Sequence, residues 1–147
     1  MATALVIGTD GTVSTVDLPA DWADRYNALR ELVGGQPESA RYHRDALLYV
    51  DGDGAGHQDS NLVAWALASA WRGLDLPYGL AGTVVATGPA EEDPLPDVLI
   101  AQAHAASEAV ALFLGRALTR RPASPDALAS ELLEAVRLSV AAAGRAA

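Results

Sequence analysis

The pattern of apolar and polar residues predicts five strands. Two β-rich runs, at residues 3–8 and 12–18, flank an Asp-Gly pair, which is a strong signal for a tight hairpin. Residues 38–43 and 46–51 predict a second hairpin around a polar turn, and the last run of this pair is expected to be central in the sheet. Residues 82–88, with valines between threonines, predict a final short strand.

Helical spacing interrupts these strands twice. Over residues 20–33 it predicts an amphipathic helix that ends at Gly34. A second helix is expected to start from a cap at Ser60 or Asn61, to end at Arg72 and to be well buried. The apolar positions are Trp22, Tyr26, Leu29 and Val33 in the first helix, and Leu62, Trp65, Leu67, Ala68 and Trp71 in the second.

The chain changes character after the last predicted strand. Residues 89–96 carry acids and prolines, the composition of a linker. Residues 97–147 then predict two helices, separated by Pro122 and Pro125. We therefore expect an α+β fold of order ββαββαβ over residues 1–88, with an antiparallel sheet and its helices on one face, extended by a C-terminal two-helix hairpin.

Composition narrows the chemistry that this chain can perform. Its 147 residues include 19 acids and 10 basic residues, for a net charge of −9, and every basic residue is arginine. The absence of lysine excludes a P-loop ATPase and a pyridoxal phosphate enzyme. The absence of cysteine excludes a thiol nucleophile, a disulfide and a cysteine zinc site. No cofactor is expected.

Targeting signals are also lacking in the sequence pattern. The first residues have no basic segment and only a short apolar run, unlike a secretory signal. The longest apolar stretch, from Val98 to Leu114, is interrupted by polar residues, which argues against a membrane span. A cytoplasmic protein without a membrane partner is expected.

Several short motifs resemble a known family. They are ALVIGTDG, ELVGG after the first helix, LLYVDGDG, and Asn61 followed by an alanine-rich helix. Over residues 3–88 the chain resembles the uncharacterised family called domain of unknown function 3846, found in actinobacteria, phages and plasmids. The resemblance implies an α+β domain often carried on mobile elements, with no assigned catalytic residues. The loop at 54–58 departs from the family's proline-containing stretch, and the C-terminal hairpin is an addition.

The loop from Asp51 to Ser60 is the main candidate for a binding site. Its acids and glycine match part of an EF-hand calcium loop, but Ala55 and Leu62 stand where two oxygen ligands are needed. A flexible turn whose Asp59 and Ser60 satisfy the next helix is the favoured explanation. The alternative is a small-molecule, nucleotide or calcium site beside the helix amides. Its candidate ligands are Asp51, Asp53, His57, Asp59 and Ser60, of which Asp51, Asp53 and Asp59 are the candidates for calcium.

Two histidines have acids near them in sequence. His43 with Asp45 has the residue types of an acid–base pair, but a tight turn explains the same residues. His104 and Glu108 lie four apart on the first C-terminal helix and so share one face. A solvated stripe is favoured over a metal pair there, because no third ligand is visible.

The charged residues suggest little about partners. The only basic cluster is Arg116, Arg120 and Arg121, near the C-terminal end of a predicted helix. Cations at this end interact favourably with the helix dipole, which is enough to explain the cluster. The alternative is a site for phosphate or for an acidic peptide. The net charge of −9 repels nucleic-acid phosphates, so no direct nucleic-acid binding is expected. The acidic surplus favours solubility first and a basic protein partner second.

The first C-terminal helix is apolar around most of its circumference, so we expect a second subunit to cover one side of it. A homodimer through residues 97–143 is predicted. The leading functional hypothesis is a non-enzymatic interaction or accessory protein, from a mobile element or an actinobacterial genome. A ligand-binding protein is the alternative, and a hydrolase using His43 or His57 ranks last. The predicted interface residues are Val98, Leu99, Ala106, Val110, Phe113, Leu114, Leu132 and Val136.

Overall fold

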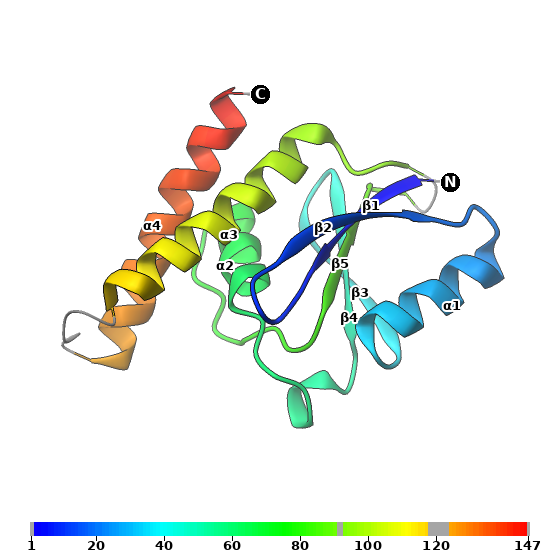
Figure 1. Cartoon of the computed structure of the whole chain (residues 1–147), viewed down its shortest axis with the longest axis horizontal. Helices are drawn as coiled ribbons and strands as arrows, with labels where there is room; N and C mark the ends of the chain where they lie inside the picture. The colour runs from blue at the N-terminus through cyan, green and yellow to red at the C-terminus, as the bar shows by residue number, and fades with distance from the viewer. Residues whose placement is uncertain (1, 91–92, 118–123, 147) are drawn as a thin grey trace.

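The computed structural model of the chain describes residues 2–90, 93–117 and 124–146. They form a five-stranded antiparallel sheet with helices on both of its faces (Figure 1). The strands are β1 (Ala2–Ile7), β2 (Val13–Leu18), β3 (Pro37–His43), β4 (Ala46–Asp51) and β5 (Val84–Thr87). The helices are α1 (Trp22–Val33), α2 (Leu62–Arg72), α3 (Asp97–Ala117) and α4 (Pro125–Ala146), with a short 3-10 turn, η1, at Gly54–Gly56.

The last strand along the chain lies in the middle of the sheet. The strand order is β2-β1-β5-β4-β3, and every pair is antiparallel. Ala86 of β5 pairs with Leu5 of β1 on one side and with Leu48 of β4 on the other. The two predicted hairpins therefore flank β5, and the α+β class with its C-terminal helix pair is confirmed.

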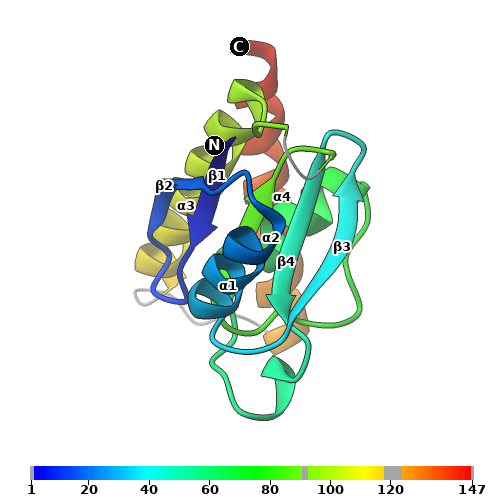
Figure 2. The same cartoon turned by 90° about the vertical axis from the view of Figure 1, so that its right-hand side faces the viewer.

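The sheet has two apolar faces, and each is covered by a different set of helices. Ala4 and Val85 belong to the core cluster that includes Leu29 of α1. Their neighbours Leu5 and Val84 belong to a second cluster with α2, α3 and α4. The expectation that both helices lie on one face is therefore wrong: α1 covers one face and α2 the other (Figures 1 and 2). All four residues of β5 are buried, and a strand buried on both sides needs a layer against each face.

The C-terminal hairpin packs on the α2 side of the sheet. Gln102 of α3 joins three helices, because its Oε1 accepts a hydrogen bond from Trp71 Nε1 of α2 at 2.9 Å and its Nε2 donates to the Val140 carbonyl of α4 at 3.1 Å. Ser107 of α3 donates to the carbonyl of Gly11 in the β1–β2 turn. The hairpin is thus part of the same core and not a separate appendage.

Most of the predicted interface residues lie inside this core. Their side chains pack against the same chain, so little of their surface is left for a second subunit, and the homodimer stays a prediction. Leu114 is 43% exposed and Val98 is partly buried. The six core residues are Leu99, Ala106, Val110, Phe113, Leu132 and Val136.

Helix α3 is also the one described helix that is long and apolar enough to cross a membrane by length and composition, with a mean hydropathy of 1.5 in its most apolar window. In this structure it packs against α4 and α2. Its outer surface carries His104 and Glu108, both exposed. The expectation of no membrane partner stays a prediction.

Candidate functional site

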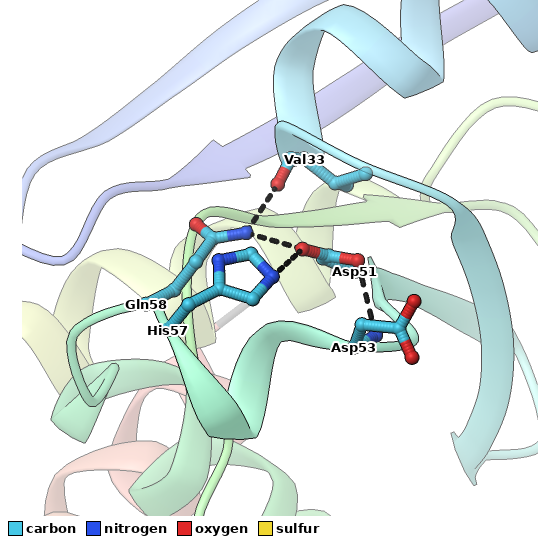
Figure 3. Close-up of polar contacts among 5 residues, drawn as sticks. All are labelled: Val33, Asp51, Asp53, His57 and Gln58. Carbon is cyan, nitrogen blue, oxygen red and sulfur yellow. Dashed lines mark hydrogen bonds and ion pairs between the residues drawn. The ribbon is translucent and has the colours of Figure 1, made fainter.

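The carboxylate of Asp51 is the centre of the predicted loop site. It lies at the end of β4, where the strand leaves the sheet, and its side chain is 2% exposed. Its Oδ2 accepts a hydrogen bond of 2.6 Å from Gln58 Nε2, and its Oδ1 accepts one of 3.1 Å from the backbone N–H of Asp53 (Figure 3). Both oxygens are therefore engaged within the loop itself.

Gln58 connects this carboxylate to the end of α1. Its Nε2 also donates to the backbone carbonyl of Val33, 25 residues earlier, at 3.1 Å (Figure 3). That carbonyl is in the last turn of α1, where no intrahelical donor remains. Gln58 was not among the predicted site residues, since a glutamine in a polar loop carries no pattern that distinguishes it.

The pKa of Asp51 is lowered from its ordinary value. The largest cause is the hydrogen bond from the backbone N–H of Asp53, followed by the one from Gln58; burial opposes both by raising the pKa. His57 Nε2 lies 3.4 Å from Asp51 Oδ2 and lowers the pKa further. The imidazole is 57% exposed, so this contact is a partly solvated ion pair when His57 is protonated.

The structure does not bring the remaining predicted ligands to this carboxylate. Asp53 gives its backbone N–H to Asp51, but its own carboxylate is exposed and points away (Figure 3). Asp59 and Ser60 are exposed too, and their backbones pair with the segment around Gly82 and Ala81. Asp51 and His57 are thus the only two of the five predicted side chains that meet.

A calcium site in this loop finds no support in the geometry. Among the described residues there is no group of three or more His, Cys, Asp or Glu side chains that could hold a metal ion. Calcium needs six to eight oxygen ligands, and Asp51, the one buried acid of this loop, already accepts hydrogen bonds at both oxygens. The arrangement ties β4, the loop and α1 together as an internal brace.

Asn61 caps the helix that follows the loop. Its Oδ1 accepts a hydrogen bond from Ala64 N at 3.0 Å, which corrects the expectation that Asp59 and Ser60 satisfy this helix end. The other cap considered from the sequence, Asn61 itself, is confirmed. It is 1% exposed, and its side chain also donates hydrogen bonds to the carbonyls of Ile7 and Gly82.

The other histidine candidates do not form catalytic pairs. His43 Nδ1 accepts a hydrogen bond from the backbone N–H of Asp45 at 3.0 Å, so the contact is that of a turn, whereas the Asp45 carboxylate lies 3.6 Å from Arg44 Nε. His104 and Glu108 are both exposed on α3, in agreement with a solvated stripe. Of the basic cluster, Arg116 lies at the end of α3, and Arg120 and Arg121 lie outside the described residues.

A cavity between α1 and the β3–β4 hairpin was missed from the sequence. It has a volume of about 210 Å³, and its walls include Trp22, Tyr26 and Tyr49. Arg25 also lines it and is buried, with 4% exposure. The sequence position of Arg25 could have indicated that it is buried. Arg25 stands three residues after Trp22 and four before Leu29, and this spacing places it on the apolar face of the helix.

Comparison of the sequence with protein-family models finds no match, and comparisons with curated proteins and with solved structures find none either. The resemblance to domain of unknown function 3846 therefore stays a prediction.

Proposed function

We propose that this protein is a non-enzymatic interaction protein whose partner surface is the outer face of the α3–α4 hairpin, with a second copy of the chain as the partner. The observation that carries the proposal is Leu112, which is 57% exposed on the wall of a groove between the two helices. A leucine exposed to this extent beside other apolar groups gains free energy when a partner covers it. The proposal includes the cytoplasmic setting expected from the sequence.

The groove between α3 and α4 has walls that suit a packed helix. Its volume is about 460 Å³. Most of its lining residues are alanines, which allow a second backbone to approach closely. Glu108 is the one charged residue among them. The lining residues are Ala105, Glu108, Ala109 and Leu112 of α3, and Ser139, Ala142, Ala143 and Ala146 of α4.

Self-association also gives His104 and Glu108 a partner. They stand four residues apart on the exposed side of α3, so a twofold axis that crosses this helix between them brings His104 of one copy near Glu108 of the other. An isologous contact of this kind pairs an imidazole with a carboxylate twice. The net charge of −9 on each copy opposes association, which makes the dimer salt-dependent; a basic protein partner on the same groove is the second outcome to test.

Light scattering after size-exclusion chromatography tests the proposal. The wild type at micromolar concentration is expected to have a mass about twice the chain mass of 15.2 kDa. The fraction of dimer is expected to rise with salt concentration. Leu112→Glu is expected to give a folded monomer. A matched control is Leu138→Glu, because Leu138 is 67% exposed on α4 but lines a different groove, beside Trp71.

Two results contradict the proposal. One is a wild type that stays monomeric across micromolar concentrations and salt. The other is a dimer that Leu112→Glu leaves intact, which places the contact elsewhere on the molecule.

The alternative is a ligand-binding site at the Asp51 loop. The geometry gives it little support, because both oxygens of the Asp51 carboxylate already accept hydrogen bonds, from Gln58 and from the backbone N–H of Asp53. A thermal-shift comparison of Asp51→Ala with the wild type, with and without calcium, addresses it directly. Calcium is expected to stabilise neither protein.

A further inference from the structure

Arg25 of α1 is a buried charge without a partner. Its side chain is 4% exposed, and its Nε and Nη2 are buried and make no hydrogen bond to any part of the described chain. Guanidinium stays protonated in proteins, and burying a charge without pairing it is costly. A neutral residue at this position would avoid that cost, yet the residue at the cavity wall is an arginine.

The cavity beside Arg25 is open to solvent on one side, and three of its seven lining residues are aromatic. Trp22 and Tyr26 stack on each other with a centroid distance of 5.8 Å and an interplanar angle of 17°. Tyr49 approaches from β4 on the opposite wall. The hydroxyl of Tyr26 accepts a hydrogen bond from Gln36 Nε2 at 2.7 Å, which fixes that ring. Flat apolar faces therefore meet one cation in a space of about 210 Å³.

The two unpaired nitrogens define the chemistry of the group that would satisfy them. Nε and Nη2 lie on the same edge of the planar guanidinium, and two parallel N–H donors on one edge match the two oxygens of a carboxylate. We propose that this cavity binds a small organic carboxylate carrying a planar apolar ring, with its carboxylate on the Nε and Nη2 edge of Arg25 and its ring against the aromatic walls. This site goes beyond the interaction surface on α3–α4 and lies on the opposite face of the sheet (Figure 2).

Size and charge favour a monoanion over a phosphate. The volume lies below the range of roughly 300–1,000 Å³ that drug-sized ligands occupy, so the ligand is a single ring with a short acid group. Arg25 is the only charged residue among those that line the cavity. Asp21 and Asp24 stand at the start of the same helix and repel a doubly charged ligand about twice as strongly as a singly charged one. One fixed cation therefore matches one negative charge.

A ligand in the cavity reaches the unpaired edge of Arg25 only if a neighbouring side chain moves, because Nε and Nη2 have no contact with solvent. Trp22 is 66% exposed, more than either of the other two aromatic wall residues, and we expect it to be the side chain that turns outward. Rotamer changes of exposed side chains take picoseconds to nanoseconds, so this movement does not limit binding.

A titration with benzoate tests the proposal on the full chain. The arginine Nε–H signals are followed by ¹H–¹⁵N NMR, and benzoate is expected to move the Arg25 signal saturably. Benzamide has the same shape without the charge, acetate has the charge without the ring, and inorganic phosphate has more charge without the ring. Each is expected to bind at least about tenfold more weakly than benzoate, the loss expected when one charged hydrogen-bonded contact or one buried ring is removed.

Two variants assign the effect to Arg25. Arg25→Met is expected to fold with a urea midpoint no lower than that of the wild type, because it replaces an unpaired buried charge by an apolar chain of similar length, and to lose benzoate binding. Arg25→Lys keeps the charge without the two-donor edge and is expected to bind about tenfold more weakly. The matched control is Arg30→Met, an exposed arginine on the same helix, which is expected to bind as the wild type does.

Four outcomes overturn the proposal, and the first three are no saturable binding of benzoate by the wild type, binding of benzamide as tight as that of benzoate, and unchanged benzoate binding by Arg25→Met. The ligand panel on the wild type decides the first two without any variant. Loss of benzoate binding in Arg30→Met as well would show a charge effect without a site at Arg25, and also overturns it.

Discussion

The side-chain amide of Asn61 donates a hydrogen bond of 2.9 Å to the backbone carbonyl of Ile7, 54 positions earlier in the chain. The same Nδ2 donates to the carbonyl of Gly82, also at 2.9 Å, while Oδ1 accepts from the backbone N–H of Ala64. One buried side chain thus joins the end of β1, the segment before β5 and the first turn of α2. The position of the Asp51 loop depends on it, because the loop ends at Asn61.

Asn61→Ala is expected to destabilise the protein by about 3 kcal/mol. The loss combines a helix cap, worth about 1 kcal/mol, with two carbonyls in a buried site that lose their donor. Urea denaturation followed by circular dichroism measures it. Ser60→Ala is the matched control, because Ser60 is exposed and precedes Asn61 directly; its effect is expected to stay within about 0.5 kcal/mol. Equal losses of stability in the two variants would show that the hydrogen bonds of the buried Asn61 amide do not account for the effect.

Asp51 makes the stability depend on acid pH. Its folded-state pKa is lowered below the ordinary value of 3.8, chiefly by the backbone N–H of Asp53 and by Gln58. A group with a lowered folded pKa stabilises the protein above its unfolded pKa, and this contribution is lost as the pH falls through the folded pKa. The wild type is therefore expected to exceed Asp51→Asn in urea midpoint at pH 7, with the gap narrowing below about pH 4.

The control for this titration is Asp53→Asn, whose carboxylate is exposed and which keeps the backbone N–H that Asp51 accepts. Its urea midpoint at pH 7 is expected to stay close to that of the wild type, because the substitution changes an exposed side chain. A gap between the wild type and Asp51→Asn that does not change with pH would contradict the assignment.

Two glycines near the loop are expected to respond in opposite directions to alanine. A Cβ at Gly35 would lie 2.4 Å from the Asp51 carboxylate, so Gly35→Ala must push that carboxylate away from Gln58; a loss of about 2 kcal/mol is expected. A Cβ at Gly56 meets nothing within 4 Å, and Gly56→Ala is expected to be neutral or to stabilise by up to about 1 kcal/mol through the unfolded state. Thermal and urea unfolding of the pair give the comparison. Similar losses in both would show that loop flexibility, and not the contact with Asp51, sets the cost.

Tyr42 on the α2 face is expected to ionise late. Burial, and after it the 2.8 Å hydrogen bond with the hydroxyl of Tyr78, raise the pKa of Tyr42 to about 12, while Arg72 opposes the shift. Because the folded pKa exceeds the ordinary value of 10.0, the stabilising contribution is complete below pH 10 and is lost as the pH rises towards 12. Tyr78→Phe is expected to lower the pKa of Tyr42 in a titration followed by ultraviolet absorbance.

Tyr49→Phe serves as the control for this titration, because Tyr49 packs with the cluster on the α1 face, away from Tyr42. It is expected to remove one ionising group and leave the pKa of Tyr42 at about 12. An unchanged Tyr42 titration in Tyr78→Phe would show that the hydroxyl pair does not contribute.

Local signals predicted most elements of the fold. Helix α2 begins after the cap at Asn61 and ends at Arg72, before Gly73, and α3 begins at Asp97, close to the boundaries that the sequence pattern indicated. These boundaries follow from caps, left-handed glycines and apolar spacing, all of which act over a few residues. They hold because no distant contact is needed to specify them.

The layers were predicted less well, although one signal for them was present. In β1, Ala4 and Leu5 are consecutive apolar residues that face opposite sides of the sheet, and β5 is apolar at Val84 and Val85 in the same way. A run without alternation indicates a strand that is covered on both faces. The same pattern applies to the inner residues of α3, which α4 and α2 cover within the one chain.

By itself the sequence determined the elements, the caps and the excluded chemistries, because each depends on residue type or on spacing within one segment. Only the tertiary structure decided which groups meet. Gln58 reaches Asp51 and Val33 because three separate segments converge there, and Arg25 is left without a partner because α1 packs it against β3 and β4. Which distant residues contact each other depends on how the two faces of the sheet are covered, and that depends on the packing of the whole chain.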